Sequence, residues 1–405
     1  MFQFARRLQL YPMRAFVLPL MLAGFVSAAL CSFANAGDQM PRFSQQIVAN
    51  DLAGGYQVVA CDLNGDGKLD LIALASNMTE LVWFENPTWQ RHVIARNLRH
   101  MINAAAWDID GDGVPEIAVA YGFSMNPAES IGNVAILHHN GDPRQPWMLH
   151  EIDRFPTSHR LRWANIDGSG KRVLINAPLV NAGAHAPDYR GHVPLVYYRL
   201  GDWKRTFISD AEEGILHGIY VTEWLGDARD ELLIGSFVGV HVYRYQLNGN
   251  WSRTELTRGD PGTWPKSGTS DIAVGRLKSE RFLATIEPWH GNQVVVYRQT
   301  RGAAPQDGWN REVIDTNLLD GHTILTADFN NDGSDEIVAG YRGKPYGVCL
   351  YEFREGKWNR EPIDAGEMSA ASCTVGDLDG NGHPAIACIG SATHNLKVYR
   401  LTTSR

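Results

Sequence analysis

Four short segments of the chain repeat one pattern of carboxylate, amide and glycine residues. Each has Asp or Asn at its first, third and fifth positions and Gly at its sixth, over residues 62–67, 108–113, 328–333 and 377–382. In a tight glycine turn these side-chain oxygens converge on one point, and such oxygens favour a hard cation such as Ca²⁺. Asp, Asn and Gly are also ordinary turn formers, which would explain a single copy. Four copies at matching places favour calcium.

Short apolar strands must hold these loops in place. In the first copy, residues 58–61 precede the loop and residues 71–74 follow it, and both runs are of strand type. The loop is therefore expected to be the turn of a β-hairpin.

The hairpin belongs to a longer repeat. Positions equivalent to Asp62 recur at intervals of 46 to 58 residues, at Asp108, Asn165, Glu223, Gly275, Asp328 and Asp377. A third apolar strand follows in every repeat, and in six repeats a Trp precedes a fourth. Self-similarity at this period is typical of propellers and other repeat arrays. We predict an all-β fold, a seven-bladed β-propeller of four-stranded blades that fills residues 37–405 as one domain. Two separate β domains are the alternative, but no linker-like stretch divides the middle.

The two ends of the chain are expected to meet in the last blade. The seventh repeat stops after its third strand, at Arg400, and residues 44–47 have the pattern of the missing fourth strand. The N-terminal strand would therefore complete the seventh blade and close the ring, which removes the exposed edges of an open sheet.

The acidic loops resemble the FG-GAP/VCBS repeat family over about residues 44–400, a family with calcium loops on propeller blades. The resemblance implies that the first, second and sixth repeats are competent, because each adds an acid four positions after the third oxygen. In the seventh repeat Ala385 stands at that place, the third and fourth repeats are degraded, and the fifth has lost the loop. The implied calcium ligands are Asp62, Asn64, Asp66 and Asp70; Asp108, Asp110, Asp112 and Glu116; Asp328, Asn330, Asp332 and Glu336; and Asp377, Asp379 and Asn381.

Three histidines share one position of the repeat. His159, His217 and His322 each stand six residues before the loop start, where the innermost strand begins and the blades converge on the central channel. We expect their imidazoles to meet at the channel mouth, on the face opposite the acidic loops. Three convergent histidines can bind Zn²⁺ or another divalent metal ion, and they also suit acid–base chemistry near neutral pH. Histidines that cap strand ends or hydrogen-bond neighbouring loops are the alternative.

Loops on the same face carry further candidates for binding. The longest insertion, residues 176–192, contains Tyr189, and His100, His290 and Arg342 occupy other turns there. Long irregular loops in a compact domain are commonly functional. Aromatic rings with Arg, Asn and His suit a carbohydrate, because they offer flat faces to the sugar ring and forked donors to its hydroxyl or carboxylate groups. Loop aromatics that simply pack on each other are the alternative.

Several segments are also similar to the propeller domain of the aldos-2-ulose dehydratases, namely residues 158–168, 216–219, 321–330 and 335–342. In that family the propeller dehydrates a keto-sugar such as 1,5-anhydro-fructose. The resemblance implies a lyase that eliminates water or an alkoxide from an oxidised sugar. His159, His217 and His322 would hold the metal ion, and Arg342 would bind a carbonyl or carboxylate group. The base or acid would be one of His100, His290 and Tyr189. The alternative function is a non-enzymatic, calcium-stabilised propeller that binds glycans or a protein at the cell surface.

The N-terminus has the pattern of a secretion signal. Three arginines, the apolar run 15–33 and a small-residue cleavage site at 34–36 predict a signal peptide over residues 1–36 and a secreted or periplasmic protein. An uncleaved anchor is the alternative, and no other stretch could span a membrane. Removal of these three arginines and no acid changes the formal charge from −8 to −11, which argues against nucleic acid as a partner.

Four cysteines remain after the predicted cleavage, too few for a disulfide scaffold. Cys373 and Cys388 would lie on facing strands of one hairpin. They could form a disulfide in an oxidising compartment, or they could be small buried apolar residues.

Overall fold

Seven four-stranded antiparallel sheets make up the computed structural model, which describes residues 42–304 and 307–402. Six sheets are formed by four consecutive strands each, and the seventh has the order β1-β28-β27-β26. The predicted seven-bladed β-propeller is therefore confirmed. The predicted signal peptide lies outside the described residues.

The strands are grouped here by their place in each blade, from the channel outward. The innermost strands are β2 (Gly55–Cys61), β6 (Asn103–Trp107), β10 (Ser158–Ala164), β14 (Leu216–Thr222), β18 (Asp271–Leu277), β22 (Gly321–Ala327) and β26 (Ala370–Gly376). The second strands are β3 (Asp70–Ala75), β7 (Glu116–Tyr121), β11 (Val173–Pro178), β15 (Glu231–Ser236), β19 (Glu280–Glu287), β23 (Glu336–Tyr341) and β27 (Ala385–Gly390). The third strands are β4 (Leu81–Glu85), β8 (Asn133–His138), β12 (His192–Tyr198), β16 (Gly239–Tyr245), β20 (Gln293–Gln299), β24 (Gly347–Arg354) and β28 (Leu396–Thr402). The outer strands are β5 (Gln90–Ala95), β9 (Met148–Arg154), β13 (Thr206–Glu213), β17 (Trp251–Thr257), β21 (Trp309–Asp315), β25 (Lys357–Ala365) and β1 (Arg42–Ala49).

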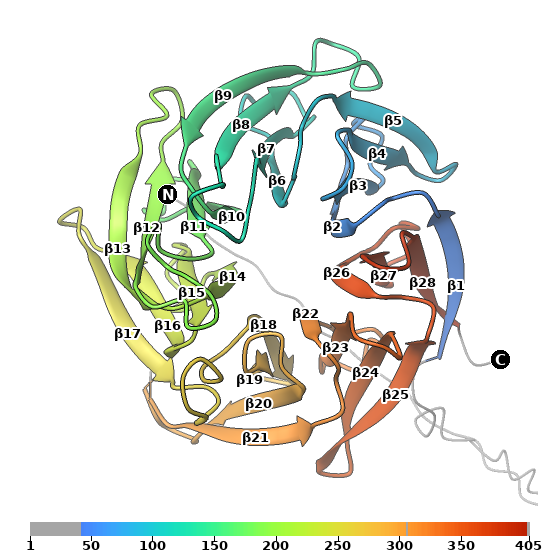
Figure 1. Cartoon of the computed structure of the whole chain (residues 1–405). Coiled ribbons are helices and arrows are strands. Elements are labelled where there is room, and N and C mark those ends of the chain that lie inside the picture. The colour runs from blue at the N-terminus through green and yellow to red at the C-terminus, as the bar shows by residue number, and fades with distance from the viewer. Residues whose placement is uncertain (1–41, 305–306, 403–405) are drawn as a thin grey trace, which may run out of the picture. The chain divides into compact units, whose positions relative to one another are not determined.

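The blades form a closed ring. Each innermost strand contacts the innermost strand of the next blade, and β26 contacts β2 to complete the cycle (Figure 1). In the last blade β1 pairs with β28, with Ser44 opposite Arg400 and Ile47 opposite Lys397. The predicted closure by the N-terminal strand is therefore confirmed, and β28 is not left as an open edge.

Apolar clusters between neighbouring sheets form the core. Between the first two blades, Ile72 and Trp83 pack against Ile117 and Leu137, all fully or almost fully buried. A similar cluster joins the last blade to the first. Because each sheet is covered on both faces, its second strand reads as a continuous apolar run instead of an alternating one. β3, for example, is buried along its whole length.

A polar contact also links neighbouring blades. The third strands of five blades carry a buried tyrosine whose hydroxyl donates to a carboxylate: Tyr198 to Asp153, Tyr243 to Glu212, Tyr297 to Glu287, Tyr351 to Asp315 and Tyr399 to Asp364. In four of these pairs the acid belongs to the outer strand of the preceding blade. An Arg or Lys of the tyrosine's own blade contacts the same acid, as Arg360 does at Asp315.

The structure also shows the pairing of two cysteines and the absence of a membrane-spanning helix in the described residues. Cys373 of β26 and Cys388 of β27 stand directly opposite each other and form a disulfide. Within the described ranges, no helix is long and apolar enough to cross a membrane.

Candidate functional site at the channel mouth

The three histidines at one repeat position meet at one end of the channel. His159, His217 and His322 are the second residues of β10, β14 and β22. The ring centroids of His159 and His217 lie 5.2 Å apart, and those of His217 and His322 lie 4.9 Å apart. His290, from the turn between β19 and β20, joins them at 5.2 Å from His217 and 5.0 Å from His322. We call these four residues the histidine cluster.

A β-bulge explains why these side chains point inward. The pairing register skips one residue between Ser158 and Arg160, between Leu216 and Gly218, and between Gly321 and Thr323. The skipped residue in each case is the histidine. A bulged residue is left out of the ladder and its side chain is re-aimed, which here turns it toward the channel mouth.

His290, and not His159, completes the group of nitrogens that is most compact. One ring nitrogen from each of His217, His290 and His322 lies within 4.8 Å of the others. The set with His290 in place of His159 is therefore the more compact candidate for a metal centre among the described residues, and metal binding by the predicted set of His159, His217 and His322 stays a prediction. A tetrahedral site with bonds of about 2.0 Å needs nitrogens roughly 3.3 Å apart, so metal binding would draw these rings together.

The tautomer of His322 fits a metal ligand. Its Nδ1 atom lies 2.5 Å from the carbonyl oxygen of Ala371, so Nδ1 must carry the proton. The lone pair is then on Nε2, which is buried and has no hydrogen-bond partner among the described residues. A backbone carbonyl that fixes the far nitrogen is the usual support of a metal-binding histidine.

Arg160 lies between two of the histidines. Its Nη1 atom is 3.2 Å from Nε2 of His159, and its Nη2 atom is 3.2 Å from Nε2 of His217. A guanidinium only donates, so both Nε2 atoms are acceptors and carry lone pairs. Arg160 therefore holds the place of a cation beside His159, and it would compete with a metal ion for Nε2 of His217.

Tyr56 holds the same repeat position in the first blade, and it too stands at a bulge. Its hydroxyl lies 2.9 Å from Nε2 of His159, and the guanidinium carbon of Arg160 lies 5.7 Å from the centroid of its ring. The sequence analysis missed Tyr56, although its position six residues before the first acidic loop could have identified it.

His290 is joined to a carboxylate and a second arginine. Its Nδ1 atom lies 3.2 Å from Oδ1 of Asp320 and 3.0 Å from Nη2 of Arg342, and Arg342 also donates to Asp320. The nitrogen can donate to the carboxylate or accept from the guanidinium, but not both. This arrangement allows the imidazole to bind or release a proton while Asp320 keeps an ionic partner.

The electrostatics of the site keep the imidazoles neutral. Burial lowers the pKa of His159, His217 and His322 well below the usual value of 6.5, and the charges of Arg160 or Arg342 lower these pKa values further. Burial also lowers the pKa of His290, although Asp320 acts in the opposite direction. Neutral imidazoles have the lone pairs that metal ligands and general bases need.

A cavity of 560 Å³ runs along the inner strands from this cluster, with Tyr56, Arg160 and His322 among its lining residues. Arg162 and Asp271 also line it. Burial raises the pKa of Asp271 despite the two nearby arginines. The volume of the cavity is within the range of about 300–1,000 Å³ that is common for small-molecule sites.

Two residues proposed from the sequence lie farther out. The ring of Tyr189 is 5.8 Å from that of Trp289, which in turn lies 4.5 Å from His290. His100 is exposed, and its carbonyl accepts a hydrogen bond from the backbone of Phe123, whose ring is 5.5 Å from His159. Both therefore border the cluster without joining it.

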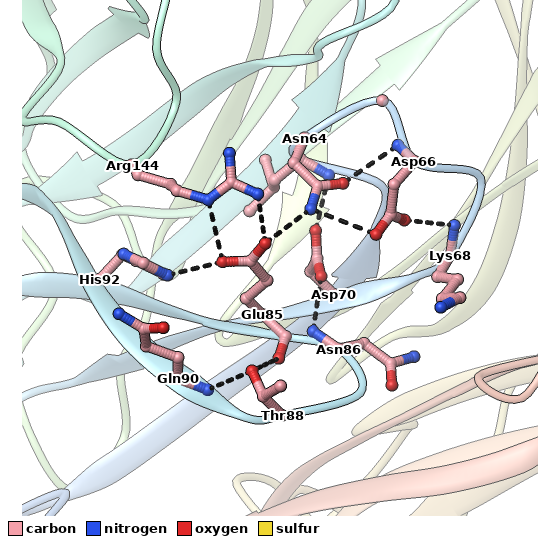
Figure 2. A network of polar contacts seen from close by, with 12 residues as sticks. Asn64, Asp66, Lys68, Asp70, Glu85, Asn86, Thr88, Gln90, His92 and Arg144 are labelled. Carbon is pink, nitrogen blue, oxygen red and sulfur yellow. Dashed lines mark hydrogen bonds and ion pairs between the residues drawn. The ribbon is translucent and has the colours of Figure 1, made fainter.

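The acidic loops lie at the opposite ends of the innermost strands. In the first blade the carboxylate of Asp62 accepts from the backbone N–H groups of Gly65 and Gly67, each at 2.8 Å. Asn64 of the same loop donates to Asp66 and to Glu85, the last residue of β4 (Figure 2). These contacts curl the loop, but its carboxylates are not among the compact groups found in the described residues.

The loops differ in one neighbouring residue, the one that follows the aromatic residue near the end of the third strand (Phe84, Tyr351 or Tyr399). In the first blade it is Glu85, which is paired with His92 at 2.8 Å and with Arg144 (Figure 2). In the sixth blade it is Glu352, which is buried and has an Oε2 atom without a partner among the described residues. In the seventh it is Arg400, which donates to both oxygens of Asp379 at 2.8 and 3.0 Å.

Two loops hold compact groups of carboxylates. One oxygen from each of Asp108, Asp110 and Glu116 lies within 4.8 Å of the others, and the same is true of Asp332, Glu336 and Glu352. Burial raises the pKa of Glu336 to about 8, and the neighbouring acids add to this effect. The sequence analysis missed Glu352, which comes from the third strand and not from the loop.

Comparisons with known proteins agree with this architecture. The family profile of the FG-GAP-like repeat matches residues 62–119 and 328–388. The profile of the aldos-2-ulose dehydratase β-propeller domain matches residues 131–301. Aldos-2-ulose dehydratase of Phanerodontia chrysosporium is 24% identical over 387 aligned residues, which cover 84% of this chain and 41% of that enzyme. The chain therefore spans less than half the length of this relative.

Solved structures share the fold at low identity. BBS1N, crystallised in complex with ARL6DN, matches with a TM-score of 0.53 and 14% identity, over 89% of this chain and 97% of that one. The Dos1 propeller matches with a TM-score of 0.53 and 9% identity, over 85% of this chain and 78% of that one. The chain is thus a seven-bladed β-propeller that contains FG-GAP-like repeats and is similar, over residues 131–301, to the propeller domain of aldos-2-ulose dehydratase.

Proposed function

We propose that this protein is a metal-assisted carbon–oxygen lyase that removes water from a keto-sugar or a related carbohydrate at the histidine cluster. The observation that carries the proposal is the convergence of four buried or half-buried imidazoles, two of which lie 3.2 Å from the guanidinium of Arg160. A module that only binds glycans has no need for such a group. The similarity to aldos-2-ulose dehydratase supports the same class of reaction.

His217, His290 and His322 would hold a divalent ion such as Zn²⁺. The open lone pair on Nε2 of His322 fits this role. When bound there, the ion would polarise the carbonyl oxygen of the substrate.

The elimination itself needs a base and an acid. The base removes a proton from the carbon beside the carbonyl, the electrons of that C–H bond form a carbon–carbon double bond, and the neighbouring hydroxyl leaves with a second proton as water. His159 is the proposed base, because its Nε2 lone pair already faces Tyr56 and Arg160. Tyr56 is the proposed acid. Asp320 would orient His290, the third proposed metal ligand, through its contact with Nδ1.

Arg160 and Arg342 would stabilise the negative charge that develops on the substrate oxygen. Fixed guanidinium donors in a buried site act strongly on such charge. Tyr189 and His100, at the border of the cluster, would contact the outer part of the sugar and take no part in proton transfer.

Substitution of His217 tests the enzymatic proposal. The His217→Ala variant should lose turnover of 1,5-anhydro-fructose, followed by the ultraviolet absorbance of the conjugated product, while it keeps the thermal unfolding midpoint of the wild type within a few degrees. The control is His150→Ala, an exposed histidine on β9. Near-normal turnover in His217→Ala would exclude this active site. A wild-type protein that binds acidic or neutral glycans but contains calcium alone and has no turnover would favour the alternative, a binding propeller.

Calcium in the loops and secretion complete the proposal. We expect Ca²⁺ in the first, second and sixth blades, where Asp62, Asp108 and Asp328 begin the loops. The seventh loop is the weakest candidate, since Arg400 already neutralises Asp379. The predicted signal peptide would direct the protein out of the cytoplasm and into an oxidising compartment. The Cys373–Cys388 disulfide is stable in such a compartment.

A further inference from the structure

The fifth blade differs from the others at the end that carries the acidic loops. Its strand β18 ends at Leu277 and β19 begins at Glu280, so Lys278 and Ser279 alone form the turn between them. Because the acidic loop is missing, a hollow of 530 Å³ opens beside the turn. Its other walls are the turn of the fourth blade at residues 224–226 and the loop at residues 299–302. We call it the arginine hollow.

Positive charge is concentrated in this hollow. Its lining contains Arg276, Arg281, Arg298 and Arg301, with Glu280 as the one acid among the described lining residues. The whole chain carries a formal charge of −8, and the equivalent places in four other blades hold acidic loops. A local excess of arginine is therefore opposite to the trend of the surrounding surface.

Two of the arginines are placed directly against each other. Arg276 and Arg281 are opposite partners in the β18–β19 ladder. Like charges at such a position destabilise a hairpin. Burial is the main cause that lowers the pKa of Arg281, and the charge of Arg276 is the second. In the described ranges Arg276 and Arg301 form no side-chain ion pair with an acid. Asp335, which accepts from the backbone N–H of Arg276, and Glu231, which acts on Arg281, offset part of the positive charge, and a bound anion would relieve the remaining repulsion.

The surroundings hold Arg281 in place. Its Nη1 atom donates to the carbonyl oxygen of Trp224 at 2.7 Å, and its guanidinium carbon lies 4.4 Å from the centroid of the Trp224 ring. Arg298 differs, because Glu312 already pairs with it at 3.1 Å. A fixed guanidinium with free N–H groups matches the two oxygens of a carboxylate, sulfate or phosphate.

We propose that the arginine hollow binds an oxyanion group through Arg276, Arg281 and Arg301. The group could be a free inorganic anion, or a carboxylate or sulfate carried by a carbohydrate. The volume of the hollow, 530 Å³, leaves room for an attached sugar residue. This site is separate from the histidine cluster, which lies at the other ends of the innermost strands. The proposal does not depend on the proposed lyase activity.

The test measures binding by isothermal titration calorimetry with full-length mature protein at low ionic strength. The ligands are inorganic sulfate, oligogalacturonate and uncharged dextran. We expect the wild type to bind at least one of the two anions, to bind no dextran at this site, and to lose affinity as salt is added. Tighter binding of oligogalacturonate than of sulfate identifies an acidic carbohydrate as the source of the oxyanion, and equal affinity per charged group identifies a simple anion.

Matched variants decide whether the hollow is responsible. Arg276→Gln/Arg301→Gln removes two exposed charges and should weaken anion binding at least tenfold. The control, Arg154→Gln/Arg258→Gln, removes two exposed arginines that pair with Glu151 and Glu255. Arg281→Met keeps an apolar side chain beside the Trp224 ring but removes the charge and the hydrogen bond to the Trp224 carbonyl oxygen, and it should weaken binding in the same way. Equal affinities in the hollow variants and the control, or no anion binding by the wild type, would overturn the proposal.

Discussion

His322 donates from Nδ1 to the carbonyl oxygen of Ala371, and these two residues hold the same repeat position in adjacent blades. Both stand at a bulge, where the register skips from Gly321 to Thr323 and from Ala370 to Ser372. The bulge that frees the carbonyl of Ala371 in the seventh blade thus fixes the ring of His322 in the sixth. One repeated irregularity of the inner strands provides both the candidate metal ligand and its support.

The first prediction concerns metal binding by this supported histidine. His322→Ala removes the buried Nε2 atom whose lone pair has no partner among the described residues, so the purified variant should contain less than a tenth of the wild-type zinc or other transition metal. Elemental analysis after dialysis against a trace of Zn²⁺ measures this. His150→Ala should retain wild-type metal content. Equal metal content in His322→Ala would show that the ion, if present, is held elsewhere.

The second prediction concerns the acid limb of the pH profile. Burial is the main cause that lowers the pKa of His159 and His217, and the charge of Arg160 is the second. Activity that needs neutral imidazoles should persist below pH 6.5 and fall as the pH approaches their lowered pKa values. In Arg160→Met the second cause is lost, so both pKa values should rise and the acid limb should move to higher pH.

Turnover at several pH values and NMR titration of the histidines measure this shift. Arg162→Met serves as the comparison, since Arg162 lies in the same cavity and contacts Asn103 and not the two imidazoles. Its charge lowers the pKa of His159 less than that of Arg160 does and is not among the causes for His217, so this variant should shift the acid limb less. An acid limb that is unchanged in Arg160→Met would mean that the guanidinium does not set the protonation of the cluster.

The architecture could be predicted from the sequence because it depends on features that recur from repeat to repeat. The period of the loops, the apolar runs and the missing last strand are all visible in the residue order, and so is the shared position of His159, His217 and His322. These features determine the number of blades, the closure of the ring and the side of the channel on which the histidines gather.

The detailed site could not be predicted because it depends on one-residue irregularities. Alternation along a strand places His159 and Arg160 on opposite faces. The bulge at β10 allows both to reach the channel mouth, and no composition or spacing signals it. Asp320 lies in a turn with a positive φ of 59° just before β22, and its contact with His290 comes from the neighbouring blade. Such contacts between blades require the ring to be closed first.

The third prediction concerns calcium. Glu352 adds a carboxylate to the group of Asp332 and Glu336 in the sixth blade. Glu352→Gln should therefore weaken calcium binding to this loop, and the sixth blade should release its ion at a chelator concentration at least tenfold lower than in the wild type. Asp379→Asn in the seventh blade is the matched change, and it should leave the calcium content unaltered because Arg400 already pairs with Asp379.

Calcium titration by calorimetry on chelated protein measures both variants. The loss of one bound ion in Asp379→Asn, with none in Glu352→Gln, would reverse the ranking of the two loops. Removal of calcium should also lower the thermal unfolding midpoint, because an ion that binds only the folded state stabilises it by mass action.

The fourth prediction concerns the contacts between blades. Tyr351 donates to Oδ2 of Asp315 at 2.6 Å, and the Nε atom of Arg360 lies 3.0 Å from the same oxygen. Tyr351→Phe removes one partner of a buried carboxylate, so the free energy of unfolding should fall by about 1–3 kcal/mol. Tyr346→Phe, on a loop, should change it by less than about 0.5 kcal/mol. Chemical denaturation with circular dichroism measures both.

The equivalent contact at Glu212 should make stability depend on pH. Burial alone would raise the pKa of this carboxyl, but His241, Arg253 and Ser236 lower it to about 2, from 4.5 in the unfolded chain. The unfolded state therefore binds more protons between these values, and the stabilisation is present above pH 4.5 and is lost as the pH falls toward 2. For a fully buried group this amounts to on the order of 3 kcal/mol. Glu212→Gln should reduce the slope of stability against pH below pH 4.5, and an unchanged slope would assign the acid sensitivity to other carboxylates.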